Sequence, residues 1–267
     1  MRKWLLILLS LCFVACVGQK EDPEEFEPLP SGIDDEPGGA EEGTVFFRRV
    51  LALGFTATWC QYCPNMSEAI AEASAQRPGR VIPLAVHYMD ELSTSEAAPL
   101  SSAFSVTDYP SLLFDLDGAT LFGGQDASRI VEYVDNALKE PSCGVSAKSE
   151  VKDGVLTLEV YVKAVKEASY TAVAAWAEDN ISVAQQAGYG PGYRCQAVLR
   201  GFLAPGTDGR ALSPLKEGDE GMVVFQAAVP SLEKPYLVVY ILEAGKVQNA
   251  IRLGTNETVQ FEYEKTD

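Results

Sequence analysis

The fold that this sequence predicts is decided by the stretch Trp59-Cys60-Gln61-Tyr62-Cys63-Pro64. It lies between an apolar, strand-like run at 45–55 and a run with helical spacing at 66–75. Two cysteines two residues apart at a helix start can close a small, reducible disulfide, and the helix N-terminus stabilises the thiolate of the first one. The motif therefore predicts a thiol–disulfide exchange site with Cys60 and Cys63 as its catalytic residues.

The same C-x-x-C spacing also occurs in zinc sites, which need two further ligands. The chain has one histidine, His87, and its other cysteines are single and distant from the pair. We therefore expect redox chemistry, with no metal and no other cofactor. His87 falls at the end of a predicted strand, where ordinary structural partners are favoured over a role as general base.

Strands and helices alternate in the pattern that follows. Strands are predicted at 45–55, 81–88, 111–115 and 119–122, and helices at 64–76, 95–104 and from Asp126, which is expected to cap the last one. Asp115-Leu116-Asp117-Gly118 resembles the start of a calcium loop but lacks the remaining ligands, so we expect a hairpin turn there.

This order, with Trp-Cys-x-x-Cys-Pro after the first strand, resembles the thioredoxin fold over roughly residues 45 to 140. The resemblance implies a cis-proline opposite the cysteines, just before the third strand, and Tyr109-Pro110 stands at that position. Proline suits it because a cis X-Pro bond costs little. A cis bond would expose the backbone of Tyr109 to a substrate peptide. We expect Cys60 to be the exposed nucleophile, Cys63 to resolve the mixed disulfide, and Trp59, Tyr109 and Pro110 to bind the substrate.

One position departs from the resemblance. Thioredoxins keep a buried acid six residues before the first cysteine, and this chain has Gly54 there. Because no nearby residue of the predicted strand replaces the acid, the departure argues against an efficient reductase.

The pattern changes in the second half of the chain, where short runs alternate at period two between Gly, Pro and Asp turns. These runs are 155–162, 171–176, 222–228, 236–242 and 258–263. They predict an antiparallel β-sandwich. The expected fold class is therefore an α/β thioredoxin-like domain at 45–141 followed by an all-β sandwich domain at 142–267.

Residues 55–64 in the first half of the chain, together with 175–181 and 197–203 in the second half, resemble the Omp-twenty-eight-related outer-membrane lipoproteins. The resemblance implies the same two-part architecture. Members often have a histidine-rich stretch just before the segment that corresponds to 197–203, but here that stretch is Tyr193-Arg194-Cys195-Gln196. Any metal or acid–base role of those histidines is therefore lost.

Residues 1–15 predict a lipoprotein signal peptide, with a basic start, an apolar run at 4–14 and the lipobox-like Phe13-Val14-Ala15-Cys16. Cys16 would then carry the lipid, palmitate included, that anchors the chain to the outer membrane. An ordinary cleaved signal with an incidental Cys16 is the alternative.

Residues 16–44 predict an acidic, disordered tether. Between Lys20 and Gly43 there are ten acidic residues and one lysine, a net charge of −9 out of −17 for the chain. Nothing in the chain indicates a nucleic-acid surface. Lys20-Glu21-Asp22 resembles the export signal of some Gram-negative surface lipoproteins, which would place the chain on the cell surface.

Six cysteines are present, of which Cys12 falls in the predicted signal and Cys16 under the lipid. An even number remains for an oxidising compartment, which predicts two disulfides. We expect Cys143 and Cys195 to form a structural disulfide; a second redox pair and free thiols are the alternatives.

The function predicted from these features is that of a lipid-anchored thiol–disulfide oxidoreductase of the Gram-negative envelope, acting on protein thiols and disulfides. A non-enzymatic surface or periplasmic lipoprotein that uses the fold as a binding scaffold is the alternative. Peroxidase chemistry is disfavoured because no arginine lies near Cys60 in sequence. The sequence makes no prediction of oligomeric state.

Overall fold

The computed structural model describes residues 45–139, 143–204 and 208–265. The predicted signal peptide and tether, Cys16, Lys20-Glu21-Asp22 and the predicted boundary at 141/142 lie outside the described residues. Among the helices that are described, none has the length and apolar character needed to cross a membrane.

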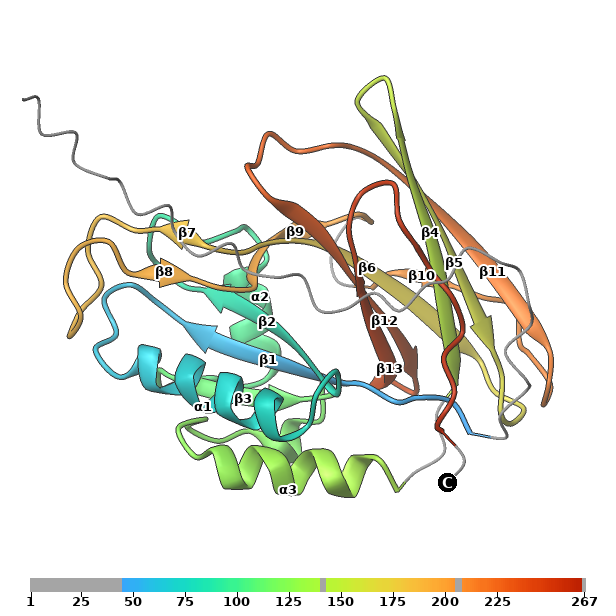
Figure 1. Cartoon of the computed structure of the whole chain (residues 1–267), viewed down its shortest axis with the longest axis horizontal. Helices are drawn as coiled ribbons and strands as arrows, with labels where there is room; N and C mark the ends of the chain where they lie inside the picture. The colour runs from blue at the N-terminus through green and yellow to red at the C-terminus, as the bar shows by residue number, and fades with distance from the viewer. Residues whose placement is uncertain (1–44, 140–142, 205–207, 266–267) are drawn as a thin grey trace, which may run out of the picture. The chain divides into compact units, whose positions relative to one another are not determined.

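Strands dominate the structure and form two main sheets (Figure 1). The larger sheet contains, in spatial order, β13 (Lys246–Leu253), β12 (Pro235–Glu243), β6 (Tyr170–Glu178), β9 (Val198–Phe202), β2 (Val81–His87), β1 (Val50–Thr56) and β3 (Ser111–Phe114), with β10 (Arg210–Ala211) paired to β6. The smaller sheet contains β11 (Glu220–Ala228), β5 (Val155–Lys163), β4 (Gly144–Lys152) and β14 (Thr258–Val259). The strands β7 (Ile181–Ser182) and β8 (Arg194–Cys195) form a short hairpin.

The predicted fold class, an α/β thioredoxin-like domain followed by an all-β sandwich domain, is wrong. The described residues contain three α-helices and fourteen strands, and one mixed sheet runs through both predicted segments. The link is β9, which pairs in parallel with β2 at Ala85 and Val198 and antiparallel with β6. The N–H of Ala85 donates to the carbonyl of Ala197 at 2.7 Å. Period-two alternation identifies a strand but not its neighbour, so the sequence pattern did not reveal this continuity.

The three helices cover the end of the large sheet that carries the cysteine motif. The helices α1 (Cys63–Gln76) and α3 (Ala127–Ala137) pack on one face of β1 and β3 (Figure 1). The helix α2 (Ala97–Ala103) packs on the other face. All seven residues of β1 are buried, as expected of a strand covered on both faces.

The two sheets enclose a separate apolar core. Residues of β5 alternate between buried and partly exposed, which confirms the period-two prediction for this strand. The inward side chains of β5, β6 and β12 in this core are Leu156, Leu158, Val160, Val162, Tyr170, Ala172, Ala174, Trp176, Leu237, Val239 and Ile241.

The predicted helices are confirmed, but the strand predicted at 119–122 is largely replaced by a short 3-10 helix, η1 (Gly118–Thr120). Only Phe122 bridges to β3, through Leu112. The side chain of Asp117 accepts a hydrogen bond from the Ala119 N–H at 3.2 Å, which starts the helix.

Asp126 caps α3, as predicted, because its Oδ1 accepts hydrogen bonds from the N–H groups of Ser128 (3.0 Å) and Arg129 (3.3 Å). We expect Asp126→Ala to lower the free energy of unfolding by about 1 kcal/mol. Urea unfolding followed by circular dichroism should show a lower midpoint at an unchanged m-value. Glu132→Ala, on the exposed face of the same helix, is the control, and an equal loss in both variants would contradict the cap.

Candidate functional site

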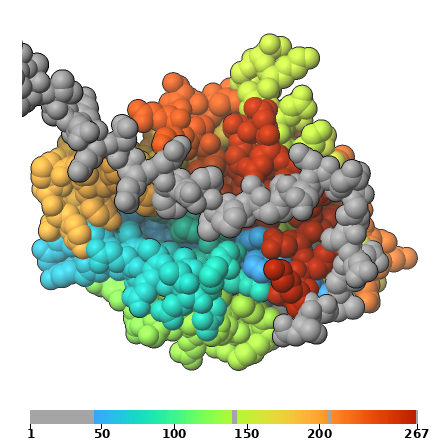
Figure 2. Space-filling view, in the orientation of Figure 1, coloured from blue at the N-terminus to red at the C-terminus, as the bar shows by residue number. Residues whose placement is uncertain are grey.

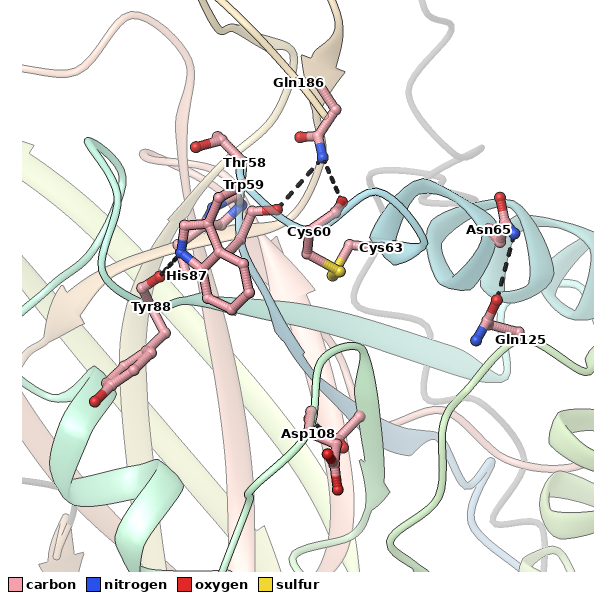
Figure 3. The surroundings of a disulfide bond; sticks show 12 residues. Thr58, Trp59, Cys60, Cys63, Asn65, His87, Tyr88, Asp108, Gln125 and Gln186 are labelled. Carbon is pink, nitrogen blue, oxygen red and sulfur yellow. Dashed lines mark hydrogen bonds between the residues drawn. A yellow bond between two sulfur atoms is a disulfide. The ribbon is translucent and has the colours of Figure 1, made fainter. Parts of the chain in front are cut away.

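Cys60 and Cys63 form a disulfide at the junction of β1 and α1, with their Cα atoms 5.5 Å apart (Figure 3). The helix begins at Cys63, with Pro64 in its first turn. The Cys60 N–H donates to the Ala57 carbonyl at 3.2 Å, and the Cys63 N–H donates to the Cys60 carbonyl at 3.4 Å. Two successive turns therefore hold Cys60 just ahead of the helix.

Both cysteines are buried, whereas Cys60 was expected to be exposed. The exposed fraction is 5% for Cys60 and 2% for Cys63. They cluster with Ala57, and Tyr109 packs against the cluster. Access to the Cys60 sulfur therefore depends on the side chains around it.

The peptide bond between Tyr109 and Pro110 is cis, as predicted. The Tyr109 ring stacks on Tyr88 with centroids 5.6 Å apart and meets Trp59 edge-on at 5.3 Å. Burial raises the pKa of the Tyr109 hydroxyl, although its hydrogen bond with Ser101 opposes the rise. The structure thus brings Trp59 and the Tyr109-Pro110 pair, all expected to bind substrate, beside the disulfide.

Exposed apolar side chains flank this arrangement. Trp59 and Tyr62 are about half exposed, and Met89 is 73% exposed. Met89 follows Tyr88, whose carbonyl accepts a hydrogen bond from the Trp59 indole at 3.0 Å. We call Trp59, Tyr62 and Met89 the apolar rim. Sequence analysis missed Met89, because a single methionine after a strand carries no motif.

A His–Asp pair with buried side chains joins the last residue of β2, His87, to Asp90 in the loop that follows. The His87 Nδ1 and an Asp90 carboxylate oxygen are 2.7 Å apart, and the same oxygen accepts from the Thr58 N–H at 2.7 Å. Burial opposes ionisation of Asp90, but its bonds with His87, Thr58 and Leu92 prevail and lower its pKa. The pair ties the end of β2 to the loop that leads into Cys60, which is the structural role expected of His87.

At Gly54, the position where thioredoxins keep a buried acid, an apolar side chain fills the available space. A Cβ atom at Gly54 would lie 2.9 Å from the terminal methyl of Met66, so the Met66 side chain fills this space. A carboxylate here would meet that methyl group in the buried layer between β1 and α1. Asp90, on the loop after β2, instead contacts the segment that leads into Cys60, by accepting a hydrogen bond from the Thr58 N–H at 2.7 Å.

The β7–β8 hairpin, from the second half of the chain, folds onto the cysteine motif. The Ala187 N–H donates to the Thr58 carbonyl at 2.8 Å. The Gln186 side-chain amide donates to the Cys60 carbonyl at 2.9 Å and to the Ala57 carbonyl at 3.4 Å (Figure 3). We call these bonds the hairpin contact. Sequence analysis missed it because glutamine in a Gly-rich loop has no pattern that names its partner.

The rest of the hairpin also lies close to the start of α1. A Cβ at Gly188 would come within 3.0 Å of the Gln61 carbonyl, so glycine permits the close approach, at a positive φ of 81°. The Tyr189 hydroxyl bonds to the Glu68 carboxylate at 2.7 Å. In Figure 2 the gold surface of the hairpin adjoins the blue surface of the residues before α1.

The predicted disulfide between Cys143 and Cys195 is absent from the structure, although both residues are described. Cys143 packs in the core between the two sheets, whereas Cys195 packs with Leu92, Val183 and Val198 under the hairpin. Burial raises the pKa of each thiol to about 12, so both stay protonated at neutral pH. Counting cysteines predicts how many pairs can form but not which residues the fold brings together.

A metal site would require a group of ligand side chains that lie close together. In the part of the chain that the structure describes, no three His, Cys, Asp or Glu side chains lie close enough together to hold an ion.

Comparison with solved structures places this arrangement among known folds. The chain shares its fold with HBP35 of Porphyromonas gingivalis. The two align with a TM-score of 0.68 at 20% identity, covering 83% of this chain and 79% of HBP35. Protein AGR_C_4864 from Agrobacterium tumefaciens aligns with a TM-score of 0.56 at 16% identity, covering 80% of this chain and 97% of that protein.

Sequence comparison adds no family to this result. No model of a known protein family matches the chain, and no curated protein matches it either. The resemblance to the Omp-twenty-eight-related lipoproteins therefore stays a prediction. The likeness to HBP35 concerns the fold, which is compatible with a redox protein because Cys60 and Cys63 stand at disulfide distance.

Proposed function

We propose that the chain is a thiol–disulfide oxidoreductase that acts on protein substrates through Cys60 and Cys63. The observation that carries the proposal is the disulfide at the start of α1 with Tyr109, which precedes the cis bond to Pro110, packed against it. A helix start favours the thiolate form of a nearby cysteine, and thiolates carry out disulfide exchange.

The exchange proceeds in two balanced steps. The Cys60 thiolate attacks one sulfur of a substrate disulfide, forms a mixed disulfide, and releases the other substrate sulfur as a thiolate. The Cys63 thiolate then attacks Cys60, closes the Cys60–Cys63 disulfide, and releases the second substrate thiolate. Two electrons pass to the substrate, and the reverse sequence oxidises a substrate dithiol.

Substrate binding is assigned to the apolar rim and to the backbone of Tyr109. An extended peptide can pair with that backbone, while the exposed Trp59 and Met89 side chains contact apolar residues of the substrate. Both cysteine residues are nearly buried, so the substrate has to displace part of their surroundings to reach Cys60.

Location in the envelope is a further part of the proposal. It rests on the signal-like residues 1–15 and on Cys16 after a lipobox-like sequence. Labelling of producing cells with radioactive palmitate should mark the wild-type chain and not Cys16→Ser, and fractionation should place the labelled chain in the outer membrane.

A second candidate is a binding protein in which the disulfide is structural. The burial of both cysteines favours it, because an inert pair is expected to be shielded. The lack of a carboxylate on β1 favours it as well.

The reduction potential of the Cys60–Cys63 pair separates the two candidates. We would equilibrate the protein in glutathione buffers, alkylate the thiols, and quantify them by mass spectrometry. A potential above about −230 mV with Cys60 alkylated first supports disulfide donation or shuffling, and a value near about −270 mV supports a reductase. A pair that stays oxidised below about −300 mV, with Cys60 shielded, supports the binding protein.

The apolar rim can be tested with a matched pair of methionines. Met89 is 73% exposed and follows Tyr88, whose carbonyl binds the Trp59 indole, and Met222 is 51% exposed on β11. We expect Met89→Ala to lower kcat/KM for a protein disulfide by about tenfold, the equivalent of 1.4 kcal/mol of lost contact. The rate with glutathione should stay unchanged. Equal effects of Met89→Ala and Met222→Ala would remove the rim from substrate binding.

A further inference from the structure

Gln186 is the one polar side chain of the β7–β8 hairpin that is buried against the cysteine motif, with an exposed fraction of 2%. Its Nε2 donates to the carbonyls of Cys60 and Ala57, at 2.9 and 3.4 Å. Figure 3 shows the amide aimed at the loop from the side opposite the sulfur atoms. The contact therefore restrains the backbone of Cys60 without covering its sulfur.

The two carbonyls are those that close the turns on either side of Cys60. The Ala57 carbonyl also accepts from the Cys60 N–H, and the Cys60 carbonyl also accepts from the Cys63 N–H. One amide group thus reinforces both turns that hold the Cα atoms of Cys60 and Cys63 5.5 Å apart. That separation lies in the range that a disulfide requires.

The backbone of the hairpin fixes the position of the glutamine. The Gln186 N–H donates to the Gly190 carbonyl at 3.0 Å, and the Gly190 N–H returns a bond to the Gln186 carbonyl at 2.8 Å. The Ala187 N–H binds the Thr58 carbonyl next to the same turn. A segment more than 120 residues away in sequence therefore sets the geometry of the loop.

From these contacts we propose that Gln186 is a positioning residue that sets the reduction potential of the Cys60–Cys63 pair. When the disulfide is reduced, its covalent link no longer holds the two turns, but the hairpin contact still does. The dithiol then loses less conformational freedom on closing again, so the contact favours the disulfide over the dithiol. This inference deepens the proposed function and rests on the pair being redox-active.

The reaction to be measured is reduction by dithiothreitol. Two electrons and two protons pass from its dithiol to the Cys60–Cys63 disulfide, which opens to two thiols, while dithiothreitol closes to its cyclic disulfide. Because the readout is an equilibrium with a small dithiol, it does not require that any protein substrate be turned over. A failure of the proposed enzymatic activity therefore leaves this test intact.

The experiment compares the full-length wild-type chain with three variants. Gln186→Met keeps the size and the apolar packing but removes the donor, and Gln186→Ala removes both. Gln185→Ala is the matched control, because Gln185 is an exposed glutamine of the same hairpin whose amide donates to the Gln186 carbonyl, at 3.4 Å, rather than to the cysteine loop. We expect both Gln186 variants to weaken the disulfide about tenfold, which raises the potential by about 30 mV for two electrons. Gln185→Ala should match the wild type.

Each other outcome overturns the proposal. If Gln186→Met keeps the wild-type potential while Gln186→Ala does not, packing rather than the amide sets the potential. If all variants share the wild-type potential, Gln186 has no positioning role.

A second measurement needs no variant. Coupling between the hairpin contact and the disulfide is reciprocal, so reduction should loosen the hairpin by the same factor. Hydrogen exchange of the Ala187 N–H should be about tenfold faster in the reduced wild-type protein than in the oxidised protein. An equal exchange rate in the two states contradicts the proposal even if the variants do not fold.

Discussion

Replacing Cys63 with serine is expected to leave Cys60 joined to substrate proteins as a stable mixed disulfide, whereas replacing Cys60 with serine abolishes exchange. Cys60 lies ahead of the helix, between two turns, and Cys63 is the first residue of α1. In the proposed exchange, attack on a substrate therefore falls to Cys60, and release of the substrate requires the sulfur of Cys63. With Cys63 gone, the second step has no nucleophile.

The measurement is non-reducing electrophoresis of the Cys63→Ser protein after incubation with envelope proteins, followed by mass spectrometry of the shifted bands. The double variant Cys60→Ser/Cys63→Ser should give none of these bands, and turnover of a peptide disulfide should fall to the uncatalysed rate in each single variant.

Cys195→Ser serves as the control, because Cys195 is a buried thiol outside the pair with a pKa of about 12. It should show wild-type turnover and no shifted bands. If Cys195→Ser loses turnover as completely as Cys60→Ser does, the assignment of the chemistry to the Cys60–Cys63 pair is incorrect.

The parts of the site that could be predicted from sequence are those encoded locally. Cys60, Cys63 and Pro64 are neighbours in the chain, so their spacing alone indicates a disulfide at a helix start. The cis bond before Pro110 was predicted from the resemblance to the thioredoxin fold, which places a cis-proline just ahead of the third strand. Periodicity located α1, α3 and β5 because each has a buried face that repeats with its own period.

The parts that could not be predicted depend on contacts between distant segments. Val198 joins the two halves of the large sheet, yet a five-residue strand with apolar residues fits many partners. Gln186 acquires its role only because β7 and β8 fold over the motif. The prediction that Cys60 is exposed was wrong for the same reason, because the residues that cover a side chain need not be its neighbours in the sequence.

A buried ion pair lies at the base of β1 and β3. Arg48 donates to a carboxylate oxygen of Asp115 at 3.1 Å and to the Ala137 carbonyl at 2.6 Å, and both charged side chains are nearly buried. The other Asp115 oxygen accepts from the Leu51 N–H at 2.9 Å. Burial raises the pKa of Asp115 to about 6 even though Arg48 lowers it.

Arg48→Met should therefore lower the free energy of unfolding by about 3–5 kcal/mol at pH 8, because it leaves the Asp115 carboxylate buried without its cation. Without Arg48 the pKa of Asp115 rises further above its unfolded value. A carboxyl group whose pKa is raised on folding stabilises the folded state at a pH below its pKa in the unfolded chain. This stabilisation is lost as the pH rises through its pKa in the folded state. The variant should thus be most unstable at pH 8 and recover part of its stability by pH 5.

A double-mutant cycle in urea tests this argument. Asp115→Asn keeps an acceptor for the Leu51 N–H and removes the charge, so Arg48→Met/Asp115→Asn should be more stable at pH 8 than Arg48→Met alone. The double variant should also lack the increase in stability that Arg48→Met shows between pH 8 and pH 5. A loss below about 1 kcal/mol in Arg48→Met, with the same pH dependence as the wild type, would mean that the pair is screened as a surface ion pair is. The contacts of Arg48 with Asp115 and Ala137 hold the ends of β1, β3 and α3 together, so the predicted loss would destabilise the scaffold on which the cysteine loop stands.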